Sequence, residues 1–410
     1  MSELIRHRYS KYLQGLEAAA LESSLPYIKG TWFYVDPDNG SNSRDGLTKT
    51  EAVADILTAY NRCTDGSGDG IVLLSGGTGT SSDTTSYLKQ SLAWSKCGIT
   101  VVGIAAPVSM FGRARIANVE VTTPANTTIA HTANSITRET GSFLLDGWVA
   151  GMKGKTVDSG SNNGSTFTVV TAAALTLTIS ETFNVQAKAS VGSCVMTSYV
   201  PELIHVSGSN NAFLNVEVFN ASSHALSLGC LKISGARNFF GNCHFVGAGH
   251  ATPAAVATAC DLALETNSAE CTFVACTFGT DTIAREATNA NVRFNGDANG
   301  VGPKRMEFHG CKFISMSATT TKGMLLSVGQ YGCQGVQLFR DCSFWNWTVN
   351  GITNLASAFI GTRPASGYFF MDGCSCMGIA AWDSVGGNDR VYVANSDATA
   401  AGAGGIATTI

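Results

Sequence analysis

The sequence predicts an all-β protein whose main body is a parallel β-helix, on the basis of a repeated motif and an unusual composition. The motif is Phe-x-x-Cys-x-Phe, and it returns at near-constant spacing through the second half of the chain. Only 14% of the 410 residues are charged, against about 25% in ordinary globular chains. Gly, Ser, Thr, Asn and Ala take their place, which favours short strands and tight turns over helices.

Four full copies of the motif and two weaker ones carry the repeat. The full copies are residues 240–245, 273–278, 308–313 and 339–344, and the weaker ones are residues 213–218 and 371–376. Their central positions are 216, 243, 276, 311, 342 and 374, so the interval stays between 27 and 35 residues. A unit of this length cannot bury its own apolar face and must stack on its neighbours. The repeat therefore predicts solenoid rungs over residues 200–395, about 4.8 Å apart.

The spacing inside the motif predicts which side chains face the core. The Cys and the second Phe are two residues apart and share one face of a strand, whereas the first Phe breaks this alternation and requires a sharp turn. The predicted core ladder is Phe213, Val216, Phe240, Cys243, Phe245, Phe273, Cys276, Phe278, Phe308, Cys311, Phe313, Phe339, Cys342, Phe344 and Cys374. The predicted turn positions are Asn215, Asn242, Gly310, Asp341 and Gly373, residue types that tolerate a left-handed backbone.

Cys243 stands directly before His244, which raises the question of a zinc site or a thiolate nucleophile. Neighbours on a strand point to opposite faces and cannot easily bind one metal ion. We interpret the cysteine column as buried small hydrophobes, with disulfides between adjacent rungs and a metal or catalytic role as the alternatives. The residues after the central position form an outward, polar column: Glu217, His244, Thr277, Lys312, Ser343 and Ser375. We therefore assign no catalytic residue, no metal ligand and no cofactor, and leave the binding residues unknown.

Residues 30–132 are expected to form the first part of the solenoid. A strand at residues 32–35 is followed by a turn-rich loop at 36–46, a helix at 48–63 and a strand at 71–74. Thr48 or Thr50 is the expected helix cap, and the helix would cover the strand edges at the solenoid end. The loop slightly resembles a calcium loop, but it lacks the terminal Glu of an EF-hand, so turn chemistry explains it better.

Residues 133–199 interrupt the repeat. Good alternation at residues 167–170 and 175–179, with turn residues at 158–164, predicts a small inserted antiparallel β-module.

Both parts of the chain resemble known families. The repeat resembles the right-handed parallel β-helix of the pectate-lyase type, which phage tailspikes also use. The insertion resembles a small β-module of bacteriophage virion proteins, apart from Ser135 at its first position and one residue fewer before Asn162. The matching residues are Thr137, Arg138, Gly141, Phe143, Asp146, Gly147, Ser159, Asn162, Asn163, Gly164, Phe167 and Val169.

These resemblances imply a structural protein at the virion surface, synthesised in the host cytoplasm. The implied form is a homotrimer that decorates the capsid or makes a head-associated fibre or spike. Its expected partners are its own copies and other virion proteins such as the major capsid protein, through the basic amphipathic segment 1–29, which could equally cap the solenoid. The C-terminal tail 396–410 could drape onto a neighbour. The alternative is a receptor-binding tailspike that binds or cleaves host surface polysaccharide, as a lyase or a glycoside hydrolase.

Composition argues against several other classes. The net charge of −4 and the pI near 6.0 give no basic field for nucleic acid or an anionic membrane. No run of about 18 apolar residues predicts a membrane span, and the N-terminus has no leader-like apolar core. We expect the 13 cysteines to be mostly thiols. Acids are sparse after residue 200 and form no Asp-Asp pair, so enzyme activity is not predicted.

Overall fold

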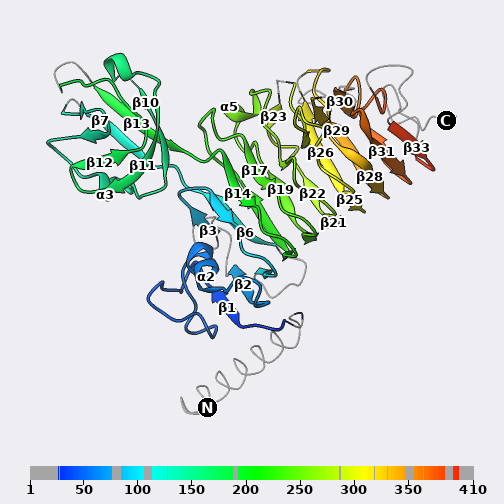
Figure 1. The fold of residues 1–410 in the computed structure, drawn as a ribbon, viewed down its shortest axis with the longest axis horizontal. Helices are drawn as coiled ribbons and strands as arrows, with labels where there is room; N and C mark the ends of the chain where they lie inside the picture. Colours follow the sequence, from blue (N-terminus) through cyan, green and yellow to red (C-terminus); the bar gives the residue numbers. More distant parts are fainter. Residues whose placement is uncertain are drawn as a thin grey trace, which may run out of the picture.

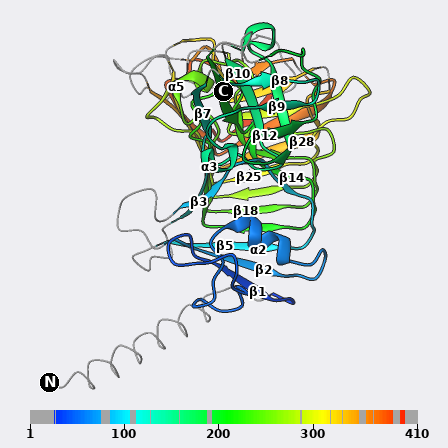
Figure 2. The same cartoon turned by 90° about the vertical axis from the view of Figure 1, so that its left-hand side faces the viewer.

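Three parallel sheets form the sides of one elongated solenoid (Figures 1 and 2). The computed structural model describes residues 26, 28–75, 85–105, 113–126, 128–157, 159–187, 193–285, 288–317, 319–329, 331–347, 355–362, 364–383 and 391–396. This architecture confirms the predicted all-β parallel β-helix. The segments 1–29 and 396–410 lie almost wholly outside the described residues.

Each sheet is named here by its strands, in spatial order. Sheet A contains β1 (Trp32–Val35), β2 (Gly70–Ser75), β5 (Thr100–Ala105), β15 (Ala212–Leu214), β18 (Phe239–Gly241), β21 (Thr272–Val274), β25 (Glu307–His309), β28 (Gln334–Arg340), β31 (Ser366–Asp372) and β33 (Val391–Ala394). Sheet B contains β3 (Thr85–Leu88), β6 (Ala114–Asn118), β16 (Val216–Phe219), β19 (His244–Val246), β22 (Thr277–Phe278), β26 (Lys312–Ser317), β29 (Ser343–Trp347) and β32 (Ser375–Met377), with β23 (Ala284–Arg285) beside β26. Sheet C contains β30 (Phe359–Gly361), β27 (Leu325–Val328), β24 (Val292–Asn295), β20 (Leu262–Leu264), β17 (Gly229–Ile233), β14 (Glu202–Val206) and β4 (Leu92–Trp94).

Each rung runs from sheet C to sheet A to sheet B, and left-handed residues turn both corners. The A-to-B corner carries the predicted turn column, and every member has positive φ: Asn215, Asn242, Ala275, Gly310, Asp341 and Gly373. The C-to-A corner carries a second column that the sequence did not reveal: Asn210, Arg237, Glu270, Arg305 and Gly335. Two charged residue types occupy this second column, so composition gave no turn signal there.

The predicted core ladder is buried at every one of its positions. Its phenylalanines form two stacks of rings along the solenoid axis. In the first stack, the centroids of Phe240, Phe273 and Phe308 are 4.8 and 4.7 Å apart. In the second, those of Phe278 and Phe313 are 5.1 Å apart. Because in-register strands repeat the same ring at each rung, both offset stacking and burial stabilise the two stacks of phenylalanine rings.

The helix near the N-terminus is shorter than predicted. Helix α2 spans Ile56–Arg62, and its N-cap is Asp55, whose carboxylate accepts a hydrogen bond from Thr58 N at 2.7 Å. The predicted helix at 48–63, capped by Thr48 or Thr50, is therefore wrong at its start. The backbone of Val53 pairs with strand β1 and the residue after it instead. Its N–H donates to Tyr34 O, and its carbonyl accepts from Asp36 N. A residue paired to a sheet cannot also belong to a helix.

A small module interrupts the solenoid between β6 and β14. Its antiparallel sheet has the order β7 (Thr122–Asn126), β13 (Cys194–Tyr199), β10 (Lys153–Val157), β11 (Thr166–Ala172), β12 (Thr176–Ile179), β9 (Ser135–Thr137) and β8 (Ala130–His131). Helix α3 (Phe143–Asp146) and the 3₁₀ turn η1 (Gly160–Asn162) belong to it, whereas α5 (Ala251–Ala254) lies on the solenoid. The module has its own apolar core, and its strands lie beside the solenoid as a separate group (Figure 1). Since β7 and β8 precede residue 133, the predicted start of the module is about ten residues too late.

Candidate functional site

The cysteines of the core ladder are free thiols that bond to backbone carbonyls. Each Sγ donates to the carbonyl of a phenylalanine in the preceding rung, at 3.3 to 3.4 Å. Cys243, for example, donates to Phe213 O. Burial raises the pKa of the Cys243 thiol well above its usual value. No disulfide joins Cys243, Cys276, Cys311, Cys342 or Cys374, and the described residues contain no group of three or more His, Cys, Asp or Glu placed to hold a metal ion.

His244 faces away from Cys243, as predicted, but it is not simply solvated. In-register pairing of β6, β16 and β19 aligns Arg115, Glu217 and His244 on the outer face of sheet B. Glu217 Oε2 accepts from Arg115 Nε at 2.7 Å, and its Oε1 lies 3.3 Å from His244 Nδ1. Burial disfavours the charged carboxylate, but the bonds from His244 and Arg115 outweigh it and lower the pKa of Glu217 to about 2. Such a group is a poor proton donor at neutral pH, so this trio stabilises the face rather than offering acid–base chemistry.

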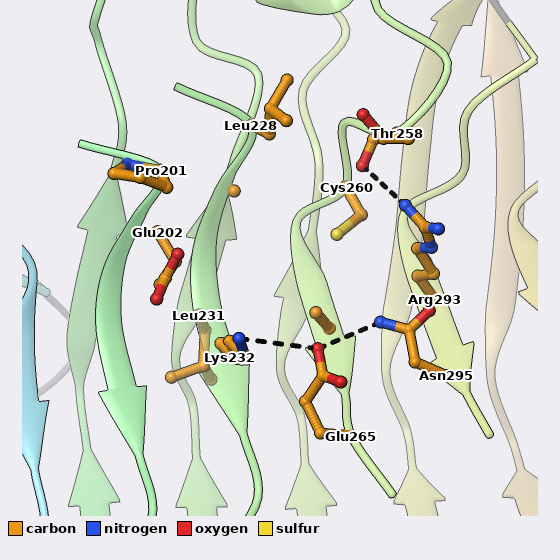
Figure 3. A pocket seen from close by; sticks show the side chains of 12 residues that line it. Pro201, Glu202, Leu228, Leu231, Lys232, Thr258, Cys260, Glu265, Arg293 and Asn295 are labelled. Atoms are coloured by element: carbon orange, nitrogen blue, oxygen red, sulfur yellow. Dashed lines mark hydrogen bonds and ion pairs between the residues drawn. The ribbon is translucent and has the colours of Figure 1, made fainter. Parts of the chain in front are cut away.

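A shallow hollow of about 170 Å³ lies on the outer face of sheet C (Figure 3). Four neighbouring strands, β14, β17, β20 and β24, supply most of its lining. Register places Lys232, Ala263 and Arg293 in one outward column on successive rungs, and His205 extends the column on β14. The small methyl of Ala263 between two long cationic side chains leaves the space open. Two carboxylates, Glu202 and Glu265, also line it.

The carboxylates of the hollow stand in different environments. Burial raises the pKa of Glu202, although Lys232 and Lys153 act in the opposite direction. Glu265 Oε1 lies 3.9 Å from Lys232 Nζ and accepts from Asn295 Nδ2 at 3.1 Å (Figure 3). Glu202 is therefore a weaker acid than usual, whereas Glu265 is held beside a cation and an amide donor.

Unlike Lys232, Arg293 has only a backbone carbonyl as its partner among the described residues. Its guanidinium donates to Thr258 O at 3.3 Å. Its Nε has no hydrogen-bond partner, and no ion pair joins it to a carboxylate within the part of the chain that the structure describes. Cys260 also lines the hollow, but burial raises the pKa of its thiol to about 12, so it is not a ready nucleophile.

A second charged cluster is sealed inside the solenoid. Arg285 and Asp261 form an ion pair at 2.5 Å with both side chains at 0% exposure. Asn291 donates to the other Asp261 oxygen at 2.9 Å, and its own oxygen accepts from Lys322 Nζ at 3.2 Å. Burial lowers the pKa of Lys322. These groups pair with one another at the corner between sheets B and C, although Arg285 Nε has no hydrogen-bond partner, and we interpret the cluster as structural.

The motif residues of the module build its interior. Arg138, whose side chain is only 2% exposed, pairs with Asp146 at 2.8 Å and lies 4.1 Å above the Phe143 ring. Gly141 has positive φ, and a Cβ there would meet the Arg138 guanidinium at 3.3 Å. Asn162 donates to Asn184 O and accepts from Asn184 N. These motif side chains thus support the module's fold, whereas Asn163 of the motif is exposed.

The outer surface of the module is unusually apolar. Among the described residues, seven of the fourteen exposed large apolar side chains belong to it: Leu144, Leu145, Val149, Val157, Val170, Leu175 and Val185. Phe143 N donates to Ala174 O at 2.8 Å, so the backbone at the start of α3 lies beside the turn before β12. Large apolar patches on a folded unit mark contact with another molecule, whereas single exposed apolar side chains are common.

No helix in the described ranges is long and apolar enough to cross a bilayer. The binding residues were unknown from the sequence, and the residues of the hollow were not among the predicted positions. A signal was available: the strand before each motif copy reads Ile-His-Val, Leu-Lys-Ile, Leu-Ala-Leu or Val-Arg-Phe, and the central residue of each is the outward column of sheet C.

No protein-family model matches the chain, and no curated protein matches it. Several solved structures are similar to it, and three of them serve as examples. A rhamnogalacturonan lyase is 12% identical over 85% of this chain and 68% of that one, with a TM-score of 0.41. A pectin methylesterase in complex with a hexasaccharide is 11% identical over 90% and 81%, with a TM-score of 0.42. The tailspike of Pseudomonas phage phi297 is 10% identical over 86% and 74%, with a TM-score of 0.27. These likenesses extend no further than the fold.

Proposed function

We propose that the chain is a structural protein of a bacteriophage virion, in which the solenoid is a rigid projecting body and the module is an attachment element. The observation that carries the proposal is the module itself. It is a separately packed unit between β6 and β14, and some of the residues that resemble phage virion modules lie in its interior, namely Phe143, Phe167, Val169 and the buried Arg138. Its apolar outer surface supports docking onto another virion protein. Decoration of the capsid is the position that we favour.

We also propose that three copies of the chain form a homotrimer. The outer face of sheet A carries exposed apolar side chains on several rungs, namely Phe239, Val274, Val336 and Tyr392. Register aligns Phe239, Thr272, Glu307, Leu338, Phe370 and Tyr392 along one outward column. A flat parallel sheet with apolar columns offers a surface that identical copies can share around a symmetry axis.

The test is the copy number and position of the protein on purified particles. Quantitative mass spectrometry against the major capsid protein, with immunogold labelling, should show many copies spread over the head. Light scattering of the purified chain should give three times the 42.7 kDa chain mass. A few copies confined to the tail would overturn capsid decoration, and absence from particles would overturn the virion proposal.

A matched pair of variants tests the module as the attachment element. Leu145 in the module is 89% exposed, and Leu47 outside it is 49% exposed. Leu145→Asp should reduce incorporation into particles several-fold, whereas Leu47→Asp should leave it unchanged. Equal incorporation of both variants would assign attachment to another part of the chain.

The second candidate is a receptor-binding tailspike that binds or cleaves host polysaccharide. One observation favours it: the hollow on sheet C brings two carboxylates and two cations together on one face. Incubation of the protein with host capsule or lipopolysaccharide, followed by assay for new reducing ends or unsaturated sugars, distinguishes cleavage from a purely structural role.

A further inference from the structure

The hollow on sheet C has the charge pattern of a binding site for an anionic group. Its two cations, Lys232 and Arg293, project from the same outward column with Ala263 between them. They stand two strand spacings apart, or roughly 10 Å. Lys232 is partly neutralised by Glu265 at 3.9 Å. Arg293 has no carboxylate partner among the described residues, so its charge remains available, and its planar fork suits a carboxylate.

The rest of the lining suits a ligand that carries hydroxyl groups beside that anion. Glu202, Glu265 and Asn295 present oxygens that can accept hydrogen bonds from hydroxyls. Leu228 and Ala263, which are both partly exposed, supply apolar surface next to them. A sugar ring offers this combination, with polar edges and apolar C–H faces, whereas an inorganic anion would use only the cations.

We propose that this hollow binds a carboxylate-bearing sugar unit of a polysaccharide, with Arg293 holding the carboxylate and with Glu202 and Glu265 receiving ring hydroxyls. The hollow is shallow and open along the sheet face, so a chain can continue beyond the bound unit. The site deepens the glycan-binding candidate described above. It is independent of where the protein sits on a particle.

The experiment is titration calorimetry of the purified full chain with three probes: oligogalacturonate, oligomannuronate and a neutral galacto-oligosaccharide of equal length. We expect at least one acidic probe to bind, and the neutral probe to bind at least tenfold more weakly. Arg293→Gln should weaken binding of the acidic probe at least tenfold. The matched control is Arg237→Gln. It removes an equal charge from a side chain that is 65% exposed and lies at the C-to-A corner, outside the hollow. This control should bind as the unchanged protein does.

A second variant separates the hollow from general electrostatic attraction. Ala263→Leu keeps every charge but fills the space between Lys232 and Arg293, and it should weaken binding as strongly as Arg293→Gln does. Circular dichroism establishes that each variant is folded. Three results would overturn the proposal: no binding of either acidic probe, unchanged binding in the two hollow variants, or competition by inorganic sulfate at equal concentration. Incorporation of the same variants into particles should stay unchanged, so failure here is distinguishable from failure of the virion proposal.

Discussion

Glu217 and His244 face each other across one strand spacing on sheet B, with Glu217 Oε1 3.3 Å from His244 Nδ1. In the sequence, the conspicuous neighbour of His244 is Cys243. In the structure these two side chains separate, because Cys243 enters the core and His244 bonds to a carboxylate of the preceding rung and to Gly279 O. The functional neighbours of a residue in this fold lie about one repeat away.

This relationship predicts how stability depends on pH. Bonds from His244 and Arg115 lower the pKa of Glu217 to about 2, so the ionised carboxylate stabilises the folded state. That stabilisation is complete above the unfolded-state pKa, near 4.5, and is lost as the pH falls towards 2. We expect Glu217→Gln to be less stable at neutral pH by at most roughly 3 kcal/mol. The gap should close in acid, as measured by chemical denaturation at a series of pH values.

The control for this prediction is Glu51→Gln, at an exposed position in the loop before α2. Its denaturation curve should follow that of the unchanged protein at every pH. A gap between Glu217→Gln and the unchanged protein that persists at pH 2 would show that the ionised carboxylate is not its cause.

Removal of the Cys243 thiol should reduce stability and nothing else. Cys243→Ala leaves a small cavity and removes the bond to Phe213 O, which should cost roughly 1–3 kcal/mol. Cys243→Val should cost less, because Val216 occupies the equivalent place one rung earlier. Thermal unfolding measures both. Loss of a bound metal or of an activity in Cys243→Ala would contradict the structural role of this column.

Substitutions at two turn residues should change the stability of the protein in opposite directions. Ala275 and Gly310 occupy the same corner on adjacent rungs, with φ of 53° and 59°. A Cβ on Gly310 would meet no atom within 4 Å, so Gly310→Ala should cost about 1 kcal/mol through backbone strain alone. Ala275→Gly should gain a similar amount. Equal signs for the two changes in unfolding free energy would refute this account of the corner.

The module should be destabilised by the loss of one buried ion pair. Asp146→Asn leaves the Arg138 guanidinium buried without its anion, which should cost about 3–5 kcal/mol. Hydrogen exchange should accelerate in β9, β11 and β12 but not in the solenoid, because the two apolar cores are separate. Asp281→Asn, at an exposed position, is the control. Acceleration throughout the solenoid would mean that the two parts unfold together.

The sequence predicted the solenoid because its rungs repeat chemically. Phe, Cys and a turn residue return at matched positions, so the core ladder and the A-to-B corner could be read directly. The second corner escaped notice because Arg237, Glu270 and Arg305 are not turn-forming types. Ion pairs from both arginines to Glu270 accompany the left-handed backbone there.

The hollow was harder to predict, because its residues lie close together in space but follow no repeated sequence motif. Glu202, Lys232, Glu265 and Arg293 come from four different rungs, and variable loops separate them in the chain. Only the register between strands shows that Lys232 and Arg293 flank Ala263. Likewise, the predicted start of the helix at Thr48 was wrong because the pairing of Val53 with β1 depends on tertiary contact.

The thiol column gives the solenoid a direction. Each ladder Sγ donates to a carbonyl of the preceding rung and never to the following one. A chain that leaves the ribosome from its N-terminus can therefore complete each of these bonds as soon as the rung is made, with the acceptor already in place. No thiol of the ladder therefore has to wait for a later rung to supply its carbonyl acceptor.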